Sequence, residues 1–183
     1  MDFRFNCIKV LMLIGLFFNS DVMALSKSKV SFKDQLSYNK EKLVLNGVGV
    51  REATIFSVDV YVAALYLVEK SQSAEEILES ETPKVFKMRF VRSVDAKKIN
   101  KAWEKALQKD GLRKKLKTLM SATKDVKKGG ELTFTFNSKK TTYYFNKKKV
   151  ASFEGRAFAK ALLSVWLGSS PPNPGLKSGL LGR

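Results

Sequence analysis

Residues 45–67 read LNGVGVREATIFSVDVYVAALYL and contain the pattern that decides the fold. The run from Val58 to Val68 is apolar at almost every position, whereas a strand covered on one face alternates apolar and polar residues. This run therefore predicts a central strand that is covered on both faces. Arg51 and Asp59 place charge in or beside that apolar surface. Burying a charge costs free energy unless the charge has a partner or a functional role. We therefore expect the segment to form one wall of a pocket.

The same segment predicts a hairpin that turns near Phe56. If the chain reverses there, Arg51 and Tyr61, each five residues from the turn, lie side by side on one face. A guanidinium beside a phenol at the mouth of an apolar pocket suits a carboxylate or enolate oxygen, through charge and paired hydrogen bonds. Arg51 and Tyr61 are therefore the candidate ligand-binding residues. The alternative is an ordinary strand-end arginine, exposed or paired with Glu52 or Asp59.

The Gly-x-Gly at Gly47 and Gly49 invites a comparison with the dinucleotide-binding fingerprint. Glu52 occupies the position of the third glycine, and a strand pattern follows where that fingerprint requires a helix. We therefore reject nucleotide binding. In a strand, the two glycines predict a bulge or a close approach of another backbone.

The first 24 residues predict a secretory signal peptide. Arg4 and Lys9 give a positive start, residues 10–18 form an apolar core, and Val-Met-Ala ending at Ala24 suits a cleavage site. The alternative, an uncleaved membrane anchor, needs roughly 17–25 apolar residues, and Asp21 interrupts the run too early. We expect cleavage near Ala24 and a periplasmic or secreted protein.

Composition excludes much catalytic chemistry. The chain has no histidine, and its single cysteine, Cys7, lies in the predicted leader. Residues 25–183 therefore contain no thiol nucleophile, no histidine base and no Cys/His metal site, and we find no Asp-rich loop with calcium-site spacing. We expect no metal and no cofactor. The length of 25–183 suits one domain with a sizeable core, which we expect to be a monomer.

The chain is strongly basic, with 34 lysines and arginines against 17 acids and a net charge of +17. An anionic partner is one interpretation, and a solvated basic surface is the other. The lysines are spread over several elements, arginines are few, and no exposed aromatic platform accompanies them, so we expect no nucleic acid. Weak contact with an anionic membrane surface stays open.

The remaining pattern predicts short strands with helices between and after them. Trp103 and Trp166 lie at the spacing of buried helix positions, where they can fill a core or line a cavity. We expect further strands over 84–90, 131–137, 141–145 and 149–153, and helices over 73–80, 95–107, 112–120, 155–167 and 176–181. This order indicates an α+β fold with a mostly antiparallel sheet.

Two stretches carry a resemblance to a known family. Residues 43–67 contain Gly-x-Gly-x-Arg and Tyr-Val-Ala-Ala-Leu-Tyr-Leu, and the C-terminal part reads Trp-Leu-Gly at 166–168 and Gly-Leu-Lys-Ser-Gly-Leu-Leu-Gly at 175–182. With the order of strands and helices, these motifs resemble the bacterial chalcone isomerase-like proteins over about 35–182. The resemblance implies an open-faced β-sandwich, in which a layer of helices covers a large, mostly antiparallel sheet and a ligand cleft lies between them.

The family includes plant enzymes that close a chalcone to a flavanone by intramolecular Michael addition, and relatives that bind fatty acids without catalysis. The family arginine that meets the ligand's negative oxygen corresponds to Arg51. The second polar position falls at Tyr61, and fatty-acid-binding relatives also have a tyrosine there. The plant enzymes' catalytic tyrosine and lysine fall near Lys97 and Asn100, and their helix asparagine falls near Glu104, so none of these three matches.

The plant enzymes' late Ser/Thr-Met pair falls at Val165-Trp166. The resemblance therefore favours non-catalytic binding of a hydrophobic carboxylate such as a fatty acid, with Arg51 at the head group and Lys97, Trp103 and Trp166 as candidate cleft residues. Two alternatives stay open. One is an intramolecular lyase or isomerase of chalcone isomerase type, in which Arg51 stabilises an enolate. The other is a structural envelope protein with a fully packed interface and a basic surface.

Overall fold

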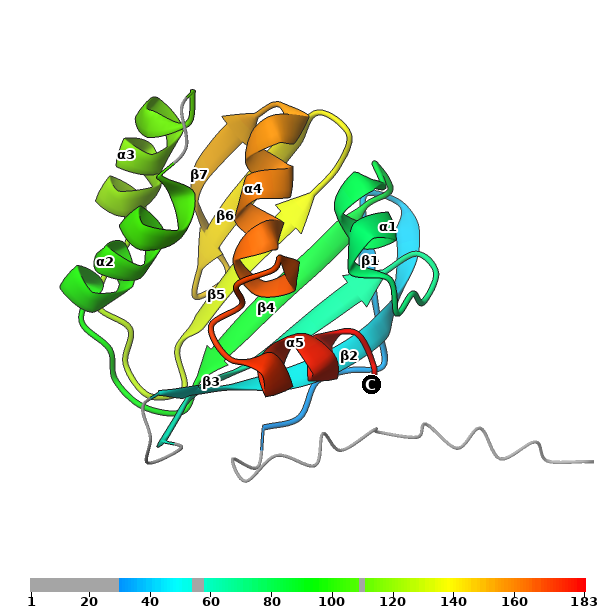
Figure 1. Ribbon diagram of the computed structural model, residues 1–183, viewed down its shortest axis with the longest axis horizontal. Helices are drawn as coiled ribbons and strands as arrows, with labels where there is room; N and C mark the ends of the chain where they lie inside the picture. The colour runs from blue at the N-terminus through cyan, green and yellow to red at the C-terminus, as the bar shows by residue number, and fades with distance from the viewer. Residues whose placement is uncertain (1–29, 54–57, 109–110) are drawn as a thin grey trace, which may run out of the picture.

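The computed structural model describes residues 30–53, 58–108 and 111–183. Within them, one antiparallel sheet has seven strands that lie in chain order, each beside the next (Figure 1). The strands are β1 (Gln35–Tyr38), β2 (Glu41–Ala53), β3 (Val58–Leu67), β4 (Lys84–Phe90), β5 (Glu131–Phe136), β6 (Lys140–Phe145) and β7 (Lys148–Glu154). The predicted leader and the turn near Phe56 lie outside the described residues.

The helices form a layer against the sheet, with α4 between the α2–α3 pair and α1, and α5 lying along β2 (Figure 1). They are α1 (Ala74–Glu79), α2 (Ala96–Leu107), α3 (Arg113–Ala122), α4 (Arg156–Leu167) and α5 (Pro174–Leu180). The predicted α+β fold with a helical layer on an antiparallel sheet is confirmed. Gly111, which has φ +80°, separates α2 from α3 because its left-handed backbone breaks the helix.

The central strand β3 is covered on both faces, as its unbroken apolar run predicts. Ala63, Leu65 and Leu67 belong to the core between the sheet and the helices. The alternate residues, Val62 and Tyr66 among them, belong to a second core on the other face, where Phe32 and Val85 also pack. Burial of each such large apolar side chain contributes about 1.5–3 kcal/mol. The strand that carries Tyr61 is thus rigidly placed.

The Gly-x-Gly of β2 is where α5 meets the sheet. A Cβ added to Gly49 would lie 2.3 Å from the Leu176 carbonyl oxygen, and one added to Gly47 would lie 2.2 Å from that of Gly179. A register shift between Leu45 and Gly47 marks a bulge at the same place. Both predicted roles of these glycines, a bulge and a close backbone approach, are confirmed.

Helix α2 is capped at its start by a residue from another part of the chain. Asp95 occupies the N-cap position, but its side chain makes no capping hydrogen bond. The carboxylate of Asp125 accepts a hydrogen bond from the Ala96 backbone N–H at 2.7 Å instead. Val94 and Val126 form an isolated antiparallel bridge, which brings the loop after α3 beside the start of α2. A distant carboxylate therefore replaces the local one.

Candidate functional site: the cavity between sheet and helices

A cavity with a volume of about 800 Å³ lies between the sheet and the helices α2 and α4. This volume falls within the range of roughly 300–1,000 Å³ that is typical of small-molecule sites. Its lining includes Val60, Met88 and Phe90 from β3 and β4, Ile99, Ala102, Trp103 and Ala106 from α2, and Ala161, Val165 and Trp166 from α4. The walls are therefore mainly apolar and aromatic.

Arg51 and Tyr61 are directly paired across β2 and β3, and both line the cavity. The side-by-side placement predicted from the hairpin is confirmed. Within the described residues, no ion pair joins Arg51 to Glu52 or Asp59, and its guanidinium makes no hydrogen bond. An arginine has five N–H donors in a planar fork, so this group can donate two parallel hydrogen bonds to an anion in the cavity.

The Tyr61 hydroxyl is a hydrogen-bond donor held inside the site. Trp166 Nε1 donates a hydrogen bond to its oxygen at 3.0 Å. Burial raises the pKa of Tyr61 to about 12, although the Trp166 bond and the charge of Arg51 act in the opposite direction. The phenol therefore keeps its proton at neutral pH. That proton can be donated to an oxygen atom that lies between Tyr61 and Arg51.

Trp103 and Trp166 serve as core residues and as cavity walls at once. They are 4 % and 1 % exposed, and their rings meet edge to face with centroids 5.8 Å apart. Trp166 also packs on Phe86, and Trp103 packs on Phe134. Such aromatic pairs contribute about 0.5–1.5 kcal/mol beyond their buried area. The rings are held in place by the same packing that shapes the cavity.

Lys97, a predicted cleft residue, is exposed and is not among the residues that line the cavity. In α2, the buried stripe consists of Ile99, Trp103 and Leu107. At 3.6 residues per turn, Lys97 lies on nearly the opposite side of the helix from Ile99. The lysines that do line the cavity are Lys98 and Lys105. Their seven-residue spacing, which places them in one row beside the stripe, is the signal that could have identified them.

Asn100 and Glu104 also lie away from the cavity. The Asn100 side-chain amide donates a hydrogen bond to the Met120 carbonyl oxygen at 3.1 Å, which ties α2 to α3. Glu104 is exposed. Neither residue lines the cavity.

The charge of the lining favours an anion. Arg51, Lys98 and Lys105 line the cavity, and no Asp or Glu does so among the described residues. In the same part of the chain, no group of three or more His, Cys, Asp or Glu could hold a metal ion. The cavity therefore presents cations and hydrogen-bond donors at the edge of an apolar space.

The loop after α4 closes one side of the cavity and was not expected there. Residues 168–172 line it, and both ends of the loop are anchored by side chains. Asn173 Nδ2 donates to the Val50 carbonyl oxygen at 3.1 Å, next to Arg51, and Lys177 Nζ donates to the Gly168 carbonyl oxygen at 2.9 Å. The Pro171-Pro172 pair restricts the backbone further. The loop is thus pinned beside the candidate anion site.

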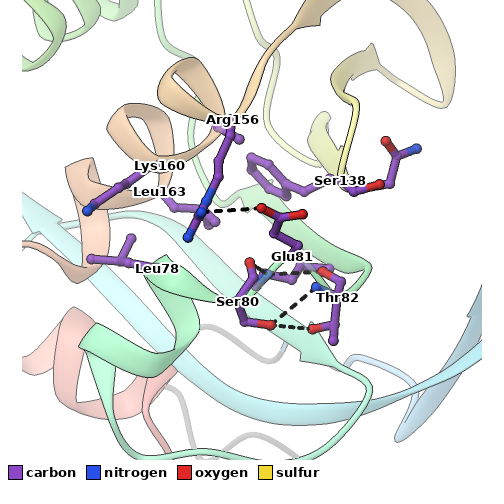
Figure 2. Close-up of a pocket in the computed structure, with 12 residues that line it drawn as sticks. Leu78, Ser80, Glu81, Thr82, Ser138, Arg156, Lys160 and Leu163 are labelled. Atoms are coloured by element: carbon purple, nitrogen blue, oxygen red, sulfur yellow. Dashed lines mark hydrogen bonds and ion pairs between the residues drawn. The ribbon is translucent and has the colours of Figure 1, made fainter.

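A second depression, between α1 and α4, is too small for a ligand (Figure 2). Its volume of about 20 Å³ is room for roughly one water molecule. Its polar groups are already satisfied: Arg156 pairs with Glu81 at 3.2 Å, and Lys84 Nζ donates to the carbonyl oxygens of Ser80 and Thr82. The larger cavity remains the candidate site.

No helix in the described part of the chain is long and apolar enough to cross a membrane. No curated protein sequence matches the chain. The crystal structure of an Arabidopsis thaliana fatty-acid binding protein matches with a TM-score of 0.70 at 15 % identity, covering 85 % of this chain and 93 % of that one. The chalcone isomerase-like family matches residues 24–182. The chain therefore belongs to the chalcone isomerase-like family.

Proposed function

We propose that this protein binds a hydrophobic carboxylate, such as a fatty acid, in the cavity between sheet and helices and does not transform it. Arg51 and the Tyr61 hydroxyl hold the carboxylate, and the apolar walls enclose the chain. The observation that carries this proposal is the position of Arg51. It lines an apolar cavity whose lining, among the described residues, includes no Asp or Glu, and it pairs in register with a protonated phenol.

The comparisons support this proposal at the level of the fold. The matched Arabidopsis structure is named a fatty-acid binding protein, and at 15 % identity the likeness concerns the fold. A fold hosts many functions, so the argument for binding rests on the cavity of this chain and its cations. A charge-assisted hydrogen bond to a carboxylate contributes about 1.5–3 kcal/mol.

The two alternatives receive less support from the structure. The positions that correspond to the plant enzymes' catalytic set, Lys97, Asn100 and Glu104, do not line the cavity. A chalcone-type cyclisation would therefore depend on Arg51 and Tyr61 alone. A fully packed interface, as expected for a purely structural protein, is at odds with a cavity of about 800 Å³.

We also propose that the protein works in the periplasm or outside the cell. The support is the sequence of residues 1–24, with its apolar core and its Val-Met-Ala ending. Mass determination of the protein isolated from its native cell tests this, because cleavage after Ala24 gives a defined mature mass. An intact Met1 end would contradict it.

Binding is tested first by native mass spectrometry of the purified protein, in which a co-purifying fatty acid is expected. The role of Arg51 is tested with a fatty acid and the fatty alcohol of equal chain length. Arg51→Ala should weaken fatty-acid binding roughly 10- to 150-fold and leave alcohol binding nearly unchanged. Arg92→Ala, an exposed arginine outside the cavity lining, is the matched control. Equal affinity of wild type and Arg51→Ala for the acid would overturn the assignment.

A further inference from the structure

The outward surface of α2, α3 and the loop after them carries a dense positive charge. Residues 96–128 contain twelve lysines and arginines against three acids, a net charge of +9 out of +17 for the whole chain. Ten of these bases are exposed, and we call them the basic face: Lys97, Lys98, Lys101, Lys105, Arg113, Lys114, Lys117, Lys124, Lys127 and Lys128. Over half of the net charge therefore lies on one side of the molecule, at the left of Figure 1.

Unlike Arg156, Lys87 and Arg89 elsewhere in the fold, the bases of the basic face are hardly neutralised by ion pairs within the described residues. At the junction of α1 and α4, Arg156 pairs with Glu81 (Figure 2). On the far face of the sheet, Glu131 pairs with two bases. Across the described residues, the basic face has a single ion pair, Lys98 with Asp95 at 3.8 Å, and these side chains are 78 % and 72 % exposed. Such an exposed pair contributes little, so the charge stays open to an external anion.

We propose that the basic face docks onto an anionic phospholipid surface. Nine of its ten bases are lysines, which act as hydrated point charges and suit a diffuse layer of lipid head groups. Nucleic-acid recognition favours arginine forks and stacking aromatics. The one aromatic residue between 96 and 128 is Trp103, and it is buried. The observations therefore favour a lipid surface.

Docking by this face also places the cavity beside the membrane. Helix α2 contributes Lys97 and Lys101 to the basic face, while Ala102 and Ala106 of the same helix line the cavity. An apolar molecule in the bilayer would then lie next to a wall of the site. The docking surface itself does not depend on which ligand the cavity holds, so its test uses protein and vesicles alone.

The test compares co-sedimentation with vesicles of phosphatidylcholine and with vesicles of phosphatidylcholine and phosphatidylglycerol in equal parts. The wild type should bind the anionic vesicles only. Added salt should release it from them, because the Debye length falls from about 10 Å at 0.1 M to about 3 Å at 1 M. Each lysine near such a surface strengthens binding roughly five-fold. The fourfold variant Lys97→Gln, Lys101→Gln, Lys114→Gln, Lys117→Gln should therefore bind on the order of 600-fold more weakly.

The matched control is Lys33→Gln, Lys40→Gln, Lys42→Gln, Lys70→Gln, which removes the same charge from exposed positions near β1, β2 and the end of β3. This variant should keep most of the vesicle binding, and melting curves establish that both variants fold. Equal loss in the two variants would show attraction by net charge alone and overturn the proposal. Absence of wild-type binding to anionic vesicles would also overturn it, as would retention on single-stranded RNA at salt that releases the vesicles.

Discussion

The indole nitrogen of Trp166 donates a hydrogen bond of 3.0 Å to the hydroxyl oxygen of Tyr61. The two residues are 105 positions apart and belong to α4 and β3, so this bond joins the helical layer to the sheet at the cavity. A phenol can accept with its lone pairs and donate its one proton. Because Trp166 uses a lone pair, the proton stays available for a ligand beside Arg51.

Tyr61→Phe should weaken binding of a fatty acid roughly 10- to 150-fold, since a hydrogen bond to a charged group is worth about 1.5–3 kcal/mol. It should also lower the free energy of unfolding by about 1–3 kcal/mol, because the buried Trp166 N–H loses its acceptor. Isothermal titration and chemical denaturation measure the two effects. Tyr38→Phe, on β1 and outside the cavity lining, is the control. Wild-type affinity in Tyr61→Phe would exclude the phenol from the ligand contact.

Filling the cavity should remove binding without unfolding the protein. Ala106 lines the cavity from α2 and is half-buried, so Ala106→Phe adds a ring where space exists. We expect at least about a tenfold loss of fatty-acid affinity, in keeping with a loss of ligand space in an apolar site. The melting temperature of the ligand-free protein should stay the same or rise.

The control for the filled cavity is Ala157→Phe, at an exposed position of α4. The fatty-acid affinity and the melting temperature of this variant should stay close to the wild-type values. If Ala106→Phe instead destabilises the protein as an overpacked core does, by about 1–3 kcal/mol, the space is not an open cavity.

The protein should lose stability at alkaline pH. Burial raises the pKa values of Tyr66 and Tyr143 to about 12, from 10.0, and these residues are 1 % and 0 % exposed. Their unfolded forms lose a proton first, so the stabilisation is complete below pH 10 and is lost as pH rises towards 12. Each contributes on the order of 2 kcal/mol over this interval.

Lys84 acts in the opposite direction at lower pH. Burial lowers its pKa to about 8 from 10.5, so the folded state gains stability as pH rises across that interval. Denaturant unfolding measured from pH 8 to 12 should therefore show a rise or plateau followed by a fall. Tyr143→Phe should reduce the alkaline fall, and an unchanged fall would contradict the assignment to this phenol.

The contact between α5 and β2 should tolerate no side chain at Gly49. The added Cβ would lie 2.3 Å from a backbone oxygen of Leu176, so Gly49→Ala must displace the helix and should cost about 1–3 kcal/mol. Gly175→Ala, in α5 itself, meets nothing closer than 3.8 Å and should be neutral or stabilising by about 0.5–1 kcal/mol. Thermal unfolding distinguishes the two variants. Equal stabilities would refute the backbone contact.

Local patterns determined the elements and the core of the site. The apolar run of β3 predicted a strand covered on both faces, and the residues equidistant from the turn predicted that Arg51 faces Tyr61. These predictions succeeded because strand periodicity and hairpin pairing are local properties that the residue order sets directly. The glycines of β2 were likewise recognisable, since only a bulge or a close contact explains two of them in one strand.

Tertiary packing decided what faces the cavity and that the cavity exists. Lys98 and Lys105 line it and Lys97 does not, because the rotation of α2 about its axis depends on how its stripe of Ile99 and Trp103 meets the sheet. The bond from Trp166 to Tyr61 requires two distant segments to be placed within 3.0 Å of each other. The sequence by itself determined the Arg51–Tyr61 pair, whose contacts are local. Only the tertiary structure decided the space in front of that pair, because a cavity is the volume that packed elements leave between them.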